Sequence, residues 1–193
     1  MKKKLIIASG NNGKLLEIEE ILGKIFEIVP MKEIGFCENI EENGKSFLEN
    51  AKIKAKTVFG FCKLPVLADD SGLCVSALDG APGVFSARYF GKNATDEQNI
   101  NKLLHEMSQK ENRAAKFVCT IVFFDGKQTI CGNGEVFGEI LKQRQGSGGF
   151  GYDSVFFCPE LNKTFAEASM EDKNKLSHRK MALEDLLTKL ENV

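Results

Sequence analysis

The spacing of apolar residues predicts a strand, a turn, a helix and a second strand in the N-terminal part of the chain. The run that starts at Leu5 is short and uniformly apolar, which is typical of a buried strand. It stops in a turn rich in Gly and Asn, Ser9 to Lys14, and leucines and isoleucines then recur at helical spacing up to Gly23. Residues 25–31 alternate and predict another short strand.

Two capping boxes predict the next helices. Ser46 is followed three positions later by Glu, and this pair begins a helix that we expect to run to about Phe59. Thr95 is followed in the same way by Gln and begins a helix that runs through Met107. Between these helices, residues 64–75 form an apolar strand that runs into two adjacent carboxylates.

The C-terminal half predicts a hairpin and a helical tail. Residues 115–141 contain a long β-branched and aromatic run, an Asp125-Gly126 turn and a return strand. A glycine-dense segment, residues 146–153, leads into a strand at Ser154, and the tail is strongly helical. A strand–helix–strand start followed by a long hairpin indicates an α/β fold with a mixed sheet. The apolar stripe of the tail consists of Leu176, Leu183, Leu186, Leu187 and Leu190.

The composition favours a single domain, residues 1–193, in the cytoplasm. A chain of 193 residues with 42% hydrophobic and 27% charged residues can bury a sizeable core. The formal net charge of −1 gives no general attraction to nucleic acid, so any anion must be bound by a local site. No apolar run approaches the roughly 20 residues that span a bilayer, and the N-terminal apolar stretch is too short for a signal peptide. The six cysteines contain no C-x-x-C pair. We therefore expect the cysteines to be small buried side chains of a protein in a reducing compartment.

The turn after the first strand suits an anion. It differs from a Walker A loop, because its glycines are closer together and Leu15 follows the lysine where that motif has Ser or Thr. Backbone N–H groups of the turn and the N-terminus of the following helix would face the anion. The residues of the turn are Ser9, Gly10, Asn11, Asn12, Gly13 and Lys14.

Two acidic pairs are candidates for binding a metal or a water molecule. Asp69 and Asp70 are adjacent in a strand, so their side chains are expected on opposite faces, and a turn at Ser71-Gly72 would free one of them. Such carboxylates suit Mg²⁺, or one of them can orient or deprotonate a water. The alternative is a solvated turn. Glu41 and Glu42 form the second pair, whose alternative is an acidic surface near a helix N-terminus.

Two further segments supply an aromatic surface and cations. The glycines of residues 146–153 imply close backbone approach or positive φ, and Phe150 and Tyr152 offer flat faces to a base. The alternatives are a flexible hairpin loop and, for the cations, a solvated helix face. Together with the turn and the acidic pairs, these segments suit a nucleoside triphosphate with magnesium. The cations considered are Lys173, Lys175, His178, Arg179 and Lys180.

These motifs, in this order, resemble the inosine/xanthosine triphosphate pyrophosphatases, which remove non-standard purine nucleotides. The likeness runs nearly end to end through ASGNNGKLLEI, SFLENAKIKA, LADDSGLCVSALDGAPGVFSARY, GGFGYDSVF and KLSHRKMAL. Ser9 stands where that family has Thr, and Ser154 stands where many members have Pro. The resemblance implies an elongated mixed β-sheet flanked by helices, two lobes with the active site in the cleft between them, and a homodimer.

The resemblance also implies the roles of the candidate residues. Asp70 would be the general base and a magnesium contact, and the other acidic metal contacts would come from Asp69 and from Glu41 or Glu42. The turn Ser9 to Lys14 would bind the triphosphate. The remaining substrate contacts would come from Ser71, Phe150, Gly151, Tyr152, Asp153, Lys173, His178 and Arg179.

The implied reaction converts a nucleoside triphosphate and water into the monophosphate and pyrophosphate with Mg²⁺. ITP, dITP and XTP are the expected substrates, because Lys173 and Arg179 only donate hydrogen bonds and a 6-oxopurine offers an O6 acceptor. One alternative is a pyrophosphatase of another fold that clears modified pyrimidine nucleotides, and another is a nucleotide-binding regulator without turnover. The balanced charge disfavours a nucleic-acid binder.

Overall fold

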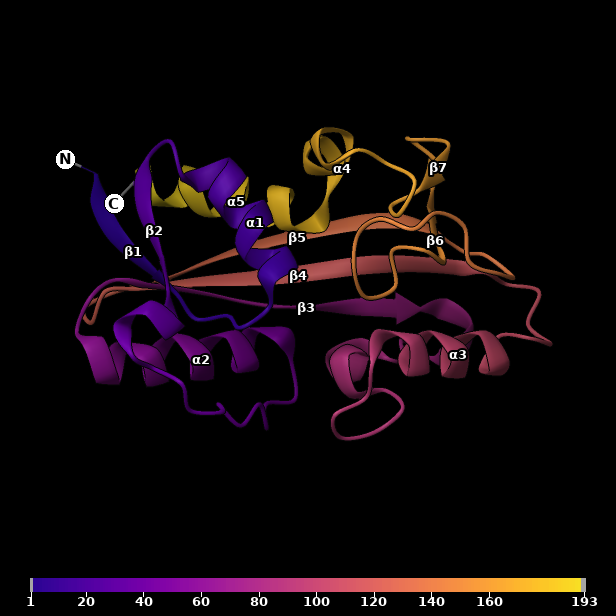
Figure 1. The fold of residues 1–193 in the computed structure, drawn as a ribbon, viewed down its shortest axis with the longest axis horizontal. Coiled ribbons are helices and arrows are strands. Elements are labelled where there is room, and N and C mark those ends of the chain that lie inside the picture. The colour runs from indigo at the N-terminus through magenta and orange to yellow at the C-terminus, as the bar shows by residue number, and fades with distance from the viewer. Residues whose placement is uncertain (1, 192–193) are drawn as a thin grey trace. The chain divides into compact units, whose positions relative to one another are not determined.

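The computed structural model describes residues 2–191 and contains one mixed β-sheet (Figure 1). Its strands are β1 (Lys3–Ile7), β2 (Phe26–Pro30), β3 (Val66–Val75), β4 (Ala114–Phe124), β5 (Thr129–Ile140), β6 (Phe156–Cys158) and β7 (Lys163–Thr164). They are ordered β2-β1-β3-β4-β5-β6-β7. β1 pairs in parallel with β2 and β3, whereas β6 pairs antiparallel with β5 and β7. The predicted α/β fold with a mixed sheet is therefore confirmed.

The helices begin where the sequence supplies caps. They are α1 (Asn12–Leu22), α2 (Phe47–Cys62), α3 (Asp96–Glu106), α4 (Met170–Leu176) and α5 (His178–Glu191), with 3-10 turns at Met31–Ile34, Ser76–Leu78 and Gly83–Arg88. The Ser46 side chain accepts from the N–H of Glu49 at the start of α2. Thr95 and Gln98 form the predicted capping box of α3. Local capping thus sets both helix starts, but the box predicted at α2 is incomplete, because Glu49 accepts from the N–H of Lys45 instead of that of Ser46.

The chain divides into two compact units. The first unit contains the chain up to Asp70, Cys119–Gly134 and the chain from Arg179 onward, and the second unit contains Ser71–Val118 and Glu135–His178. Two unit boundaries, after Asp70 and after His178, fall inside motifs that the sequence singles out. The single domain over residues 1–193 stays a prediction, as does the cleft.

In the first unit, helices cover both faces of the strands. Figure 1 shows α2 on one face and α1 with α5 on the other. Alternate strand residues serve the two faces, as the two-residue period of a strand requires. Leu5, Ile7 and Leu67 pack with Ile18, Leu22, Ala182, Leu183 and Leu186 of α1 and α5. Ile6, Ala8, Val66 and Ala68 pack with Ala51, Ala55 and Val58 of α2.

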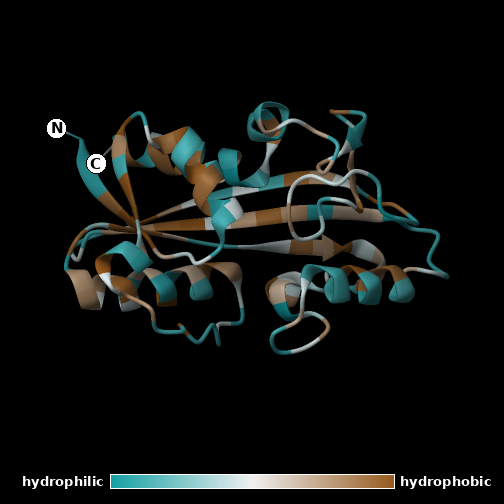
Figure 2. Cartoon of the chain, viewed as in Figure 1, coloured by the Kyte–Doolittle hydropathy of each residue, from teal (hydrophilic) through white to brown (hydrophobic). Residues whose placement is uncertain are grey.

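In the second unit, one core lies between α3 and the strands. Ile100 and Leu103 of α3 pack with Leu73, Phe117 and Phe156 from three strands. Figure 2 shows both hydrophobic and hydrophilic residues along α3, as expected for a helix with one buried face. Leu103 is fully buried. This core supports the glycine-rich segment, because Tyr152 and Val155 belong to it.

The structure differs from the sequence-based expectation at the end of α2, which runs to Cys62 rather than to about Phe59, and at three further places. β3 does not turn at Ser71-Gly72 but continues to Val75. β6 begins at Phe156 rather than Ser154, because the N–H groups of Val155 and Phe156 both donate to the Tyr152 carbonyl and form a turn. The helical tail is broken at Ser177, which has extended backbone (φ −70°, ψ 149°). The break leaves Leu176 at the end of α4 and begins α5 at His178.

No helix within residues 2–191 is both long enough and apolar enough to cross a membrane. All six cysteines of the chain lie within these residues, and all six are free thiols. The expectation that they are buried holds for Cys119 and Cys158 but is wrong for the exposed Cys37 and the half-buried Cys62, Cys74 and Cys131.

Candidate active site

The turn after β1 is held by its own side chains and leads directly into α1. Ser9 Oγ accepts from the N–H of Asn11 at 3.2 Å, and Asn11 Oδ1 accepts from the N–H of Lys14 at 3.1 Å. Asn11 is therefore the N-cap of α1. Backbone N–H groups at a helix start favour an anion, so the phosphate site at this turn stays a prediction with which the capped geometry is compatible.

Asp69 and Asp70 lie on opposite faces of β3. Asp69 follows Leu67 onto the face of α1 and α5, where its Oδ2 lies 2.9 Å from Lys14 Nζ. Asp70 follows Ala68 onto the face of α2, where its Oδ2 accepts from Asn50 Nδ2 at 3.0 Å. The predicted separation of the two carboxylates is confirmed, and each one has its own set of neighbours.

Asp69 is surrounded by cations. Besides Lys14, the Arg179 guanidinium donates to Asp69 Oδ2 from Nε at 3.2 Å and from Nη2 at 3.1 Å. Arg179 also donates to Glu17, and Arg179 and Asp69 are both essentially inaccessible. Burial alone would raise the pKa of Asp69, but Lys14 and Arg179 outweigh it and hold the pKa well below its usual range. Asp69 is therefore a permanent carboxylate that fixes Lys14 and Arg179.

Asp70 has a different environment, because it faces one amide and one ammonium. Lys54 Nζ lies 3.6 Å from Asp70 Oδ1 and 3.0 Å from Glu42 Oε1. Burial raises the pKa of Asp70, with Lys54 opposing this effect. Burial alone would lower the pKa of Lys54, but Asp70, Asp69 and Glu42 together raise it. Asp70 is thus a buried carboxylate of raised basicity, which suits a group that accepts a proton.

The donor set around Asp70 fits a magnesium ion in part. Within residues 2–191 no group of three His, Cys, Asp or Glu side chains is placed to hold a metal. Mg²⁺ usually takes only one or two protein carboxylates and completes its shell with phosphate oxygens and water. Asp70 and Glu42 share Lys54 as a neighbour, whereas Glu41 is exposed and Asp69 is occupied by Lys14 and Arg179. Asp70 and Glu42 are accordingly the carboxylates that could hold the ion.

In the second unit, the Asp153 carboxylate binds both the glycine-rich segment and Lys173. Its Oδ2 accepts from Lys173 Nζ at 2.6 Å and from the N–H of Phe150 at 2.9 Å. The ammonium of Lys173 lies 4.6 Å from the centre of the Phe150 ring. Gly149 has a positive φ of 72°, and a Cβ there would lie 2.2 Å from Asp153 Oδ2. Only glycine allows this closed arrangement, which confirms that the segment needs close backbone approach.

The other predicted substrate residues differ in their exposure. The Tyr152 ring is buried and its hydroxyl donates to the Ser86 carbonyl at 2.8 Å, so the half-buried Phe150 is the more accessible aromatic face. His178 is buried and its ring stacks on Phe117, with centroids 4.9 Å apart. Ser71 and Gly151 are half-buried, and the N–H of Gly151 donates to Asp96 at 2.7 Å.

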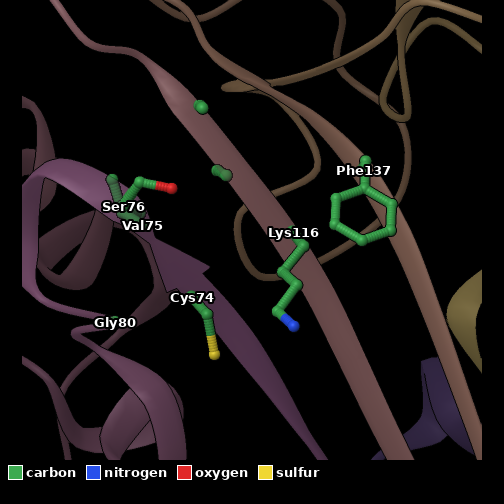
Figure 3. Close-up of a pocket in the computed structure, with 8 residues that line it drawn as sticks. Cys74, Val75, Ser76, Gly80, Lys116 and Phe137 are labelled. Atoms are coloured by element: carbon green, nitrogen blue, oxygen red, sulfur yellow. The ribbon is translucent and has the colours of Figure 1, made fainter.

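A separate pocket of about 320 Å³ lies in the second unit (Figure 3). Figure 3 shows Lys116 between the side chains of Cys74 and Phe137. Phe137 is 63% exposed. The pocket contains none of the residues that the sequence predicts at the site. Its lining residues are Cys74, Val75, Ser76, Gly80, Ala114, Ala115, Lys116 and Phe137.

Sequence reasoning missed three polar residues that the structure places beside the two aspartates. Glu17 in α1 meets Arg179, and Asn50 and Lys54 in α2 meet Asp70. All three are buried. Glu17 precedes Ile18, and Asn50 and Lys54 each precede a buried alanine, so the helical pattern places them at the edge of an apolar face. A polar residue at such a position is the signal that could have identified them.

The mixed sheet, the capped helix start after β1 and the two aspartates on opposite faces of β3 define an α/β protein with a buried cluster of carboxylates and cations. The chain belongs to the Ham1 family, because the model of that family matches residues 5–189.

Known proteins resemble this chain over nearly its whole length. A dITP/XTP pyrophosphatase of Haemophilus influenzae is 45% identical over 98% of this chain and 100% of that protein. A dITP/XTP pyrophosphatase of Halalkalibacterium halodurans is 46% identical over 95% of this chain and 97% of that protein. The solved structure of a HAM1 protein from Coxiella burnetii is 41% identical, covers 100% of both chains and has a TM-score of 0.89. These likenesses confirm the resemblance seen in the sequence motifs.

Proposed function

We propose that this protein hydrolyses non-standard purine nucleoside triphosphates, such as dITP, ITP and XTP, to the monophosphate and pyrophosphate and so cleanses the nucleotide pool. The observation that carries the proposal is the near full-length similarity to proteins named dITP/XTP pyrophosphatase. Further support comes from the two aspartates of β3, since Asp69 lies among cations whereas Asp70 is a buried carboxylate on the opposite face.

The bond that is cleaved can be tested with labelled water. Hydrolysis of dITP in H₂¹⁸O is expected to place the label in dIMP, because water attacks the α-phosphorus and pyrophosphate leaves. Mass spectrometry of the two products reads the label. Label found in pyrophosphate would contradict attack at the α-phosphorus, and formation of dIDP with phosphate would contradict the proposed reaction.

The residues of the first unit supply the chemistry of this reaction. Asp70 orients the attacking water and takes its proton, for which its raised pKa is suited. Lys14 and the N–H groups at the start of α1 stabilise the negative charge that develops on the phosphoryl oxygens. Asp69 keeps the Lys14 ammonium in place through the 2.9 Å contact. Catalysis therefore rests mainly on positioning and on charge stabilisation.

We propose that Asp70 and Glu42 hold the magnesium ion. When bound, Mg²⁺ supplies charge stabilisation and orients the phosphate oxygens. The support is that these two carboxylates share the Lys54 ammonium, at 3.6 and 3.0 Å. A chelator is expected to abolish turnover and added Mg²⁺ to restore it. Full turnover in the chelator would contradict the requirement for the ion.

Lys14→Ala is expected to weaken triphosphate binding and to slow hydrolysis by about tenfold to 100-fold, since it removes a charged hydrogen-bond donor. The ammonium has three N–H donors, so it can hold Asp69 and a phosphate oxygen together. IMP has no β- or γ-phosphate and is expected to bind as in wild type. Calorimetry with both nucleotides measures the difference, and the exposed Lys24→Ala serves as control. Equal losses for both nucleotides would place Lys14 away from the β- and γ-phosphates.

Lys173 is proposed as the donor that recognises the base. Arg179, the other predicted base contact, donates to Asp69 and Glu17 and is fully buried, so its proposed role is to hold Asp69. Lys173 lies against the Phe150 ring, on which a base can stack. An ammonium only donates, so it pairs with O6 of hypoxanthine and opposes the N6 amino group of adenine.

Lys173→Met is expected to lower the ratio of dITP to dATP turnover by about tenfold or more, because a charged hydrogen bond to O6 is lost. Methionine keeps an unbranched stem beside Phe150, so packing is largely preserved. Lys175→Met in the same helix is the control, because Lys175 is exposed and pairs with Glu171. An unchanged ratio in Lys173→Met would assign base recognition to other groups.

We propose that the protein is a homodimer in the cytoplasm. The support for a dimer is the exposed Phe137 side chain, which lines a mainly apolar pocket together with Lys116 and Ser76, since large exposed aromatics favour an interface. The six free thiols fit a reducing compartment. Light scattering is expected to give twice the 21.4 kDa of the chain, and the mass of one chain would contradict the dimer.

A further inference from the structure

The Asn50 side chain connects a loop of the first unit to Asp70. Asn50 lies in the first turns of α2 and has no exposed surface. Its Nδ2 donates to Asp70 Oδ2 at 3.0 Å, and its Oδ1 accepts from the N–H of Gly44 at 2.8 Å. Both ends of the amide are therefore used, one by Asp70 and the other by the loop that precedes α2.

The loop is packed closely against this amide. A Cβ at Gly44 would lie 2.7 Å from Asn50 Oδ1 and 2.7 Å from Glu49 Cβ. Such distances are too short for any side chain, so the loop approaches α2 in a way that only glycine permits. The contact fixes the backbone two residues after Glu42, which is the proposed partner of Asp70 in holding the metal ion.

A second bridge runs parallel to the first. Lys54 is one helical turn after Asn50, so both side chains project from the same face of α2. Lys54 links Glu42 to Asp70 by charge, at 3.0 and 3.6 Å, as Asn50 links Gly44 to Asp70 by hydrogen bonds. The two bridges hold one carboxylate of the loop and one carboxylate of β3 in a common arrangement.

We propose that Asn50 is a positioning residue for the hydrolysis of nucleoside triphosphates, because it sets the orientation of the Asp70 carboxylate and anchors the loop that carries Glu42. This inference rests on the proposed function of the same site. An amide is the suitable group, since it combines a donor for the carboxylate with an acceptor for the backbone N–H. The Asn50 side chain itself has no exposed surface in this position.

Loss of the Asn50 side chain is expected to lower turnover rather than substrate binding. Without the Nδ2 donor, Asp70 can rotate away from the attacking water, and a misplacement of about 1 Å costs about 10²-fold in rate. Lys14, Phe150 and Lys173 are proposed to bind the triphosphate and the base, and their contacts lie elsewhere: Lys14 pairs with Asp69, and Lys173 lies against the Phe150 ring. The expected signature is therefore a fall in kcat with little change in KM.

The test compares Asn50→Ala with a matched control, Asn99→Ala. Asn99 is a buried asparagine of α3 that also accepts from a loop N–H, that of Phe90 at 2.8 Å, and donates to the Ala87 carbonyl at 3.2 Å. Both variants lose two hydrogen bonds made by a buried asparagine, so both are expected to lose thermal stability. Asn50→Ala is expected to lose about 10²-fold in kcat for dITP, with KM within about threefold of wild type. Asn99→Ala is expected to keep both constants within the same threefold range.

Asn50→Asp tests the two hydrogen bonds of the amide separately. It is also the second variant to use if Asn50→Ala does not fold. An ionised aspartate can still accept from the Gly44 N–H but offers no donor to Asp70, so the variant is assayed at about pH 8 or above, where the carboxylates are ionised. The Gly44 amide is expected to exchange slowly with solvent in wild type and Asn50→Asp, and about tenfold faster or more in Asn50→Ala. Amide exchange by NMR measures this in the protein without nucleotide or metal. Asn50→Asp is expected to lose kcat despite its protected Gly44.

The outcomes distinguish this inference from the proposed function. If wild type and Asn99→Ala hydrolyse dITP, and a folded Asn50 variant retains kcat within about threefold, the positioning role is wrong and the proposed function stands. Gly44 exchange as fast in wild type as in Asn50→Ala would also overturn it. If wild type itself does not hydrolyse dITP, the proposed function fails first.

Discussion

Asp70→Asn is expected to lower the turnover of dITP by about 10²- to 10⁴-fold, the usual contribution of a positioned general base. An amide keeps the size of the side chain but cannot take the proton of the attacking water. It also offers the metal a weaker ligand than a carboxylate does. dITP is still expected to bind, because Lys14 and Lys173 are unchanged. Steady-state turnover and calorimetric binding of dITP measure the two effects.

The control for this prediction is Asp79→Asn, at an exposed position. Asp79 has a positive φ of 52°, a conformation that asparagine also tolerates. Turnover near the wild-type value in Asp70→Asn would reject Asp70 as the group that accepts the proton, whereas Asp79→Asn should behave as wild type.

Asp70→Asn is expected to change the stability of the fold only modestly, because two effects on the free energy of unfolding oppose each other. Burial raises the pKa of Asp70 above its ordinary value of 3.8, so the folded state binds the proton more tightly than the unfolded state. Stability from this group is therefore lost as the pH rises above 3.8, and the ionised carboxylate is unfavourable at pH 7. A neutral amide removes this cost but also takes one carboxylate from the buried Lys54, which keeps Glu42 as a partner at 3.0 Å. The free energy of unfolding at pH 7 should therefore change less in Asp70→Asn than in Asp69→Asn.

Asp69→Asn is expected to act mainly on stability, in contrast to Asp70→Asn, and to lower the free energy of unfolding at pH 7 by about 3–5 kcal/mol. Removing one partner of a buried ion pair has this typical cost, because the remaining charge is left without compensation. Asp69 accepts from Arg179 and pairs with Lys14, and Arg179 is fully buried. Urea unfolding of the two neighbouring Asp→Asn variants gives the comparison directly.

The contribution of Asp69 to the free energy of unfolding should decrease at acidic pH. Lys14 and Arg179 hold its pKa below the ordinary value of 3.8, so the stability it contributes is fully present above that value. That contribution is lost progressively as the pH falls below 3.8, and the difference between wild type and Asp69→Asn should narrow there. A difference that is small at pH 7, or that widens on acidification, would contradict the cation cluster.

The alternation of β3 was predictable, whereas the end of β3 was not. Adjacent strand residues must face opposite sides, and Asp69 and Asp70 do so. The expected turn at Ser71-Gly72 is wrong, because β3 continues to Val75 in the sheet beside β4. Sheet pairing and packing of buried Gly72 and Leu73 override the local preference of Asp, Ser and Gly for turns.

The side-chain partners of the site could not be predicted, because they depend on contacts far apart in the chain. The sequence motif beside His178 predicts that Arg179 contacts the base, but the position of Arg179 in α5 brings it to Asp69 and to Glu17 of α1. The break at Ser177 is also invisible, since one extended residue leaves the helical spacing on either side intact. Local motifs thus predicted the residue types, and the packing of helices on the sheet determined their partners.

The most direct test of the proposed function is the rate of pyrophosphate release from a panel of nucleotides under the same conditions with Mg²⁺. The proposed function predicts that kcat/KM for dITP, ITP and XTP exceeds that for dATP and ATP by about 10²-fold or more, since the base site must donate to O6 and leaves buried donors unpaired against an amino group. Equal rates for dITP and dATP, or no pyrophosphate from any of these nucleotides, would contradict it.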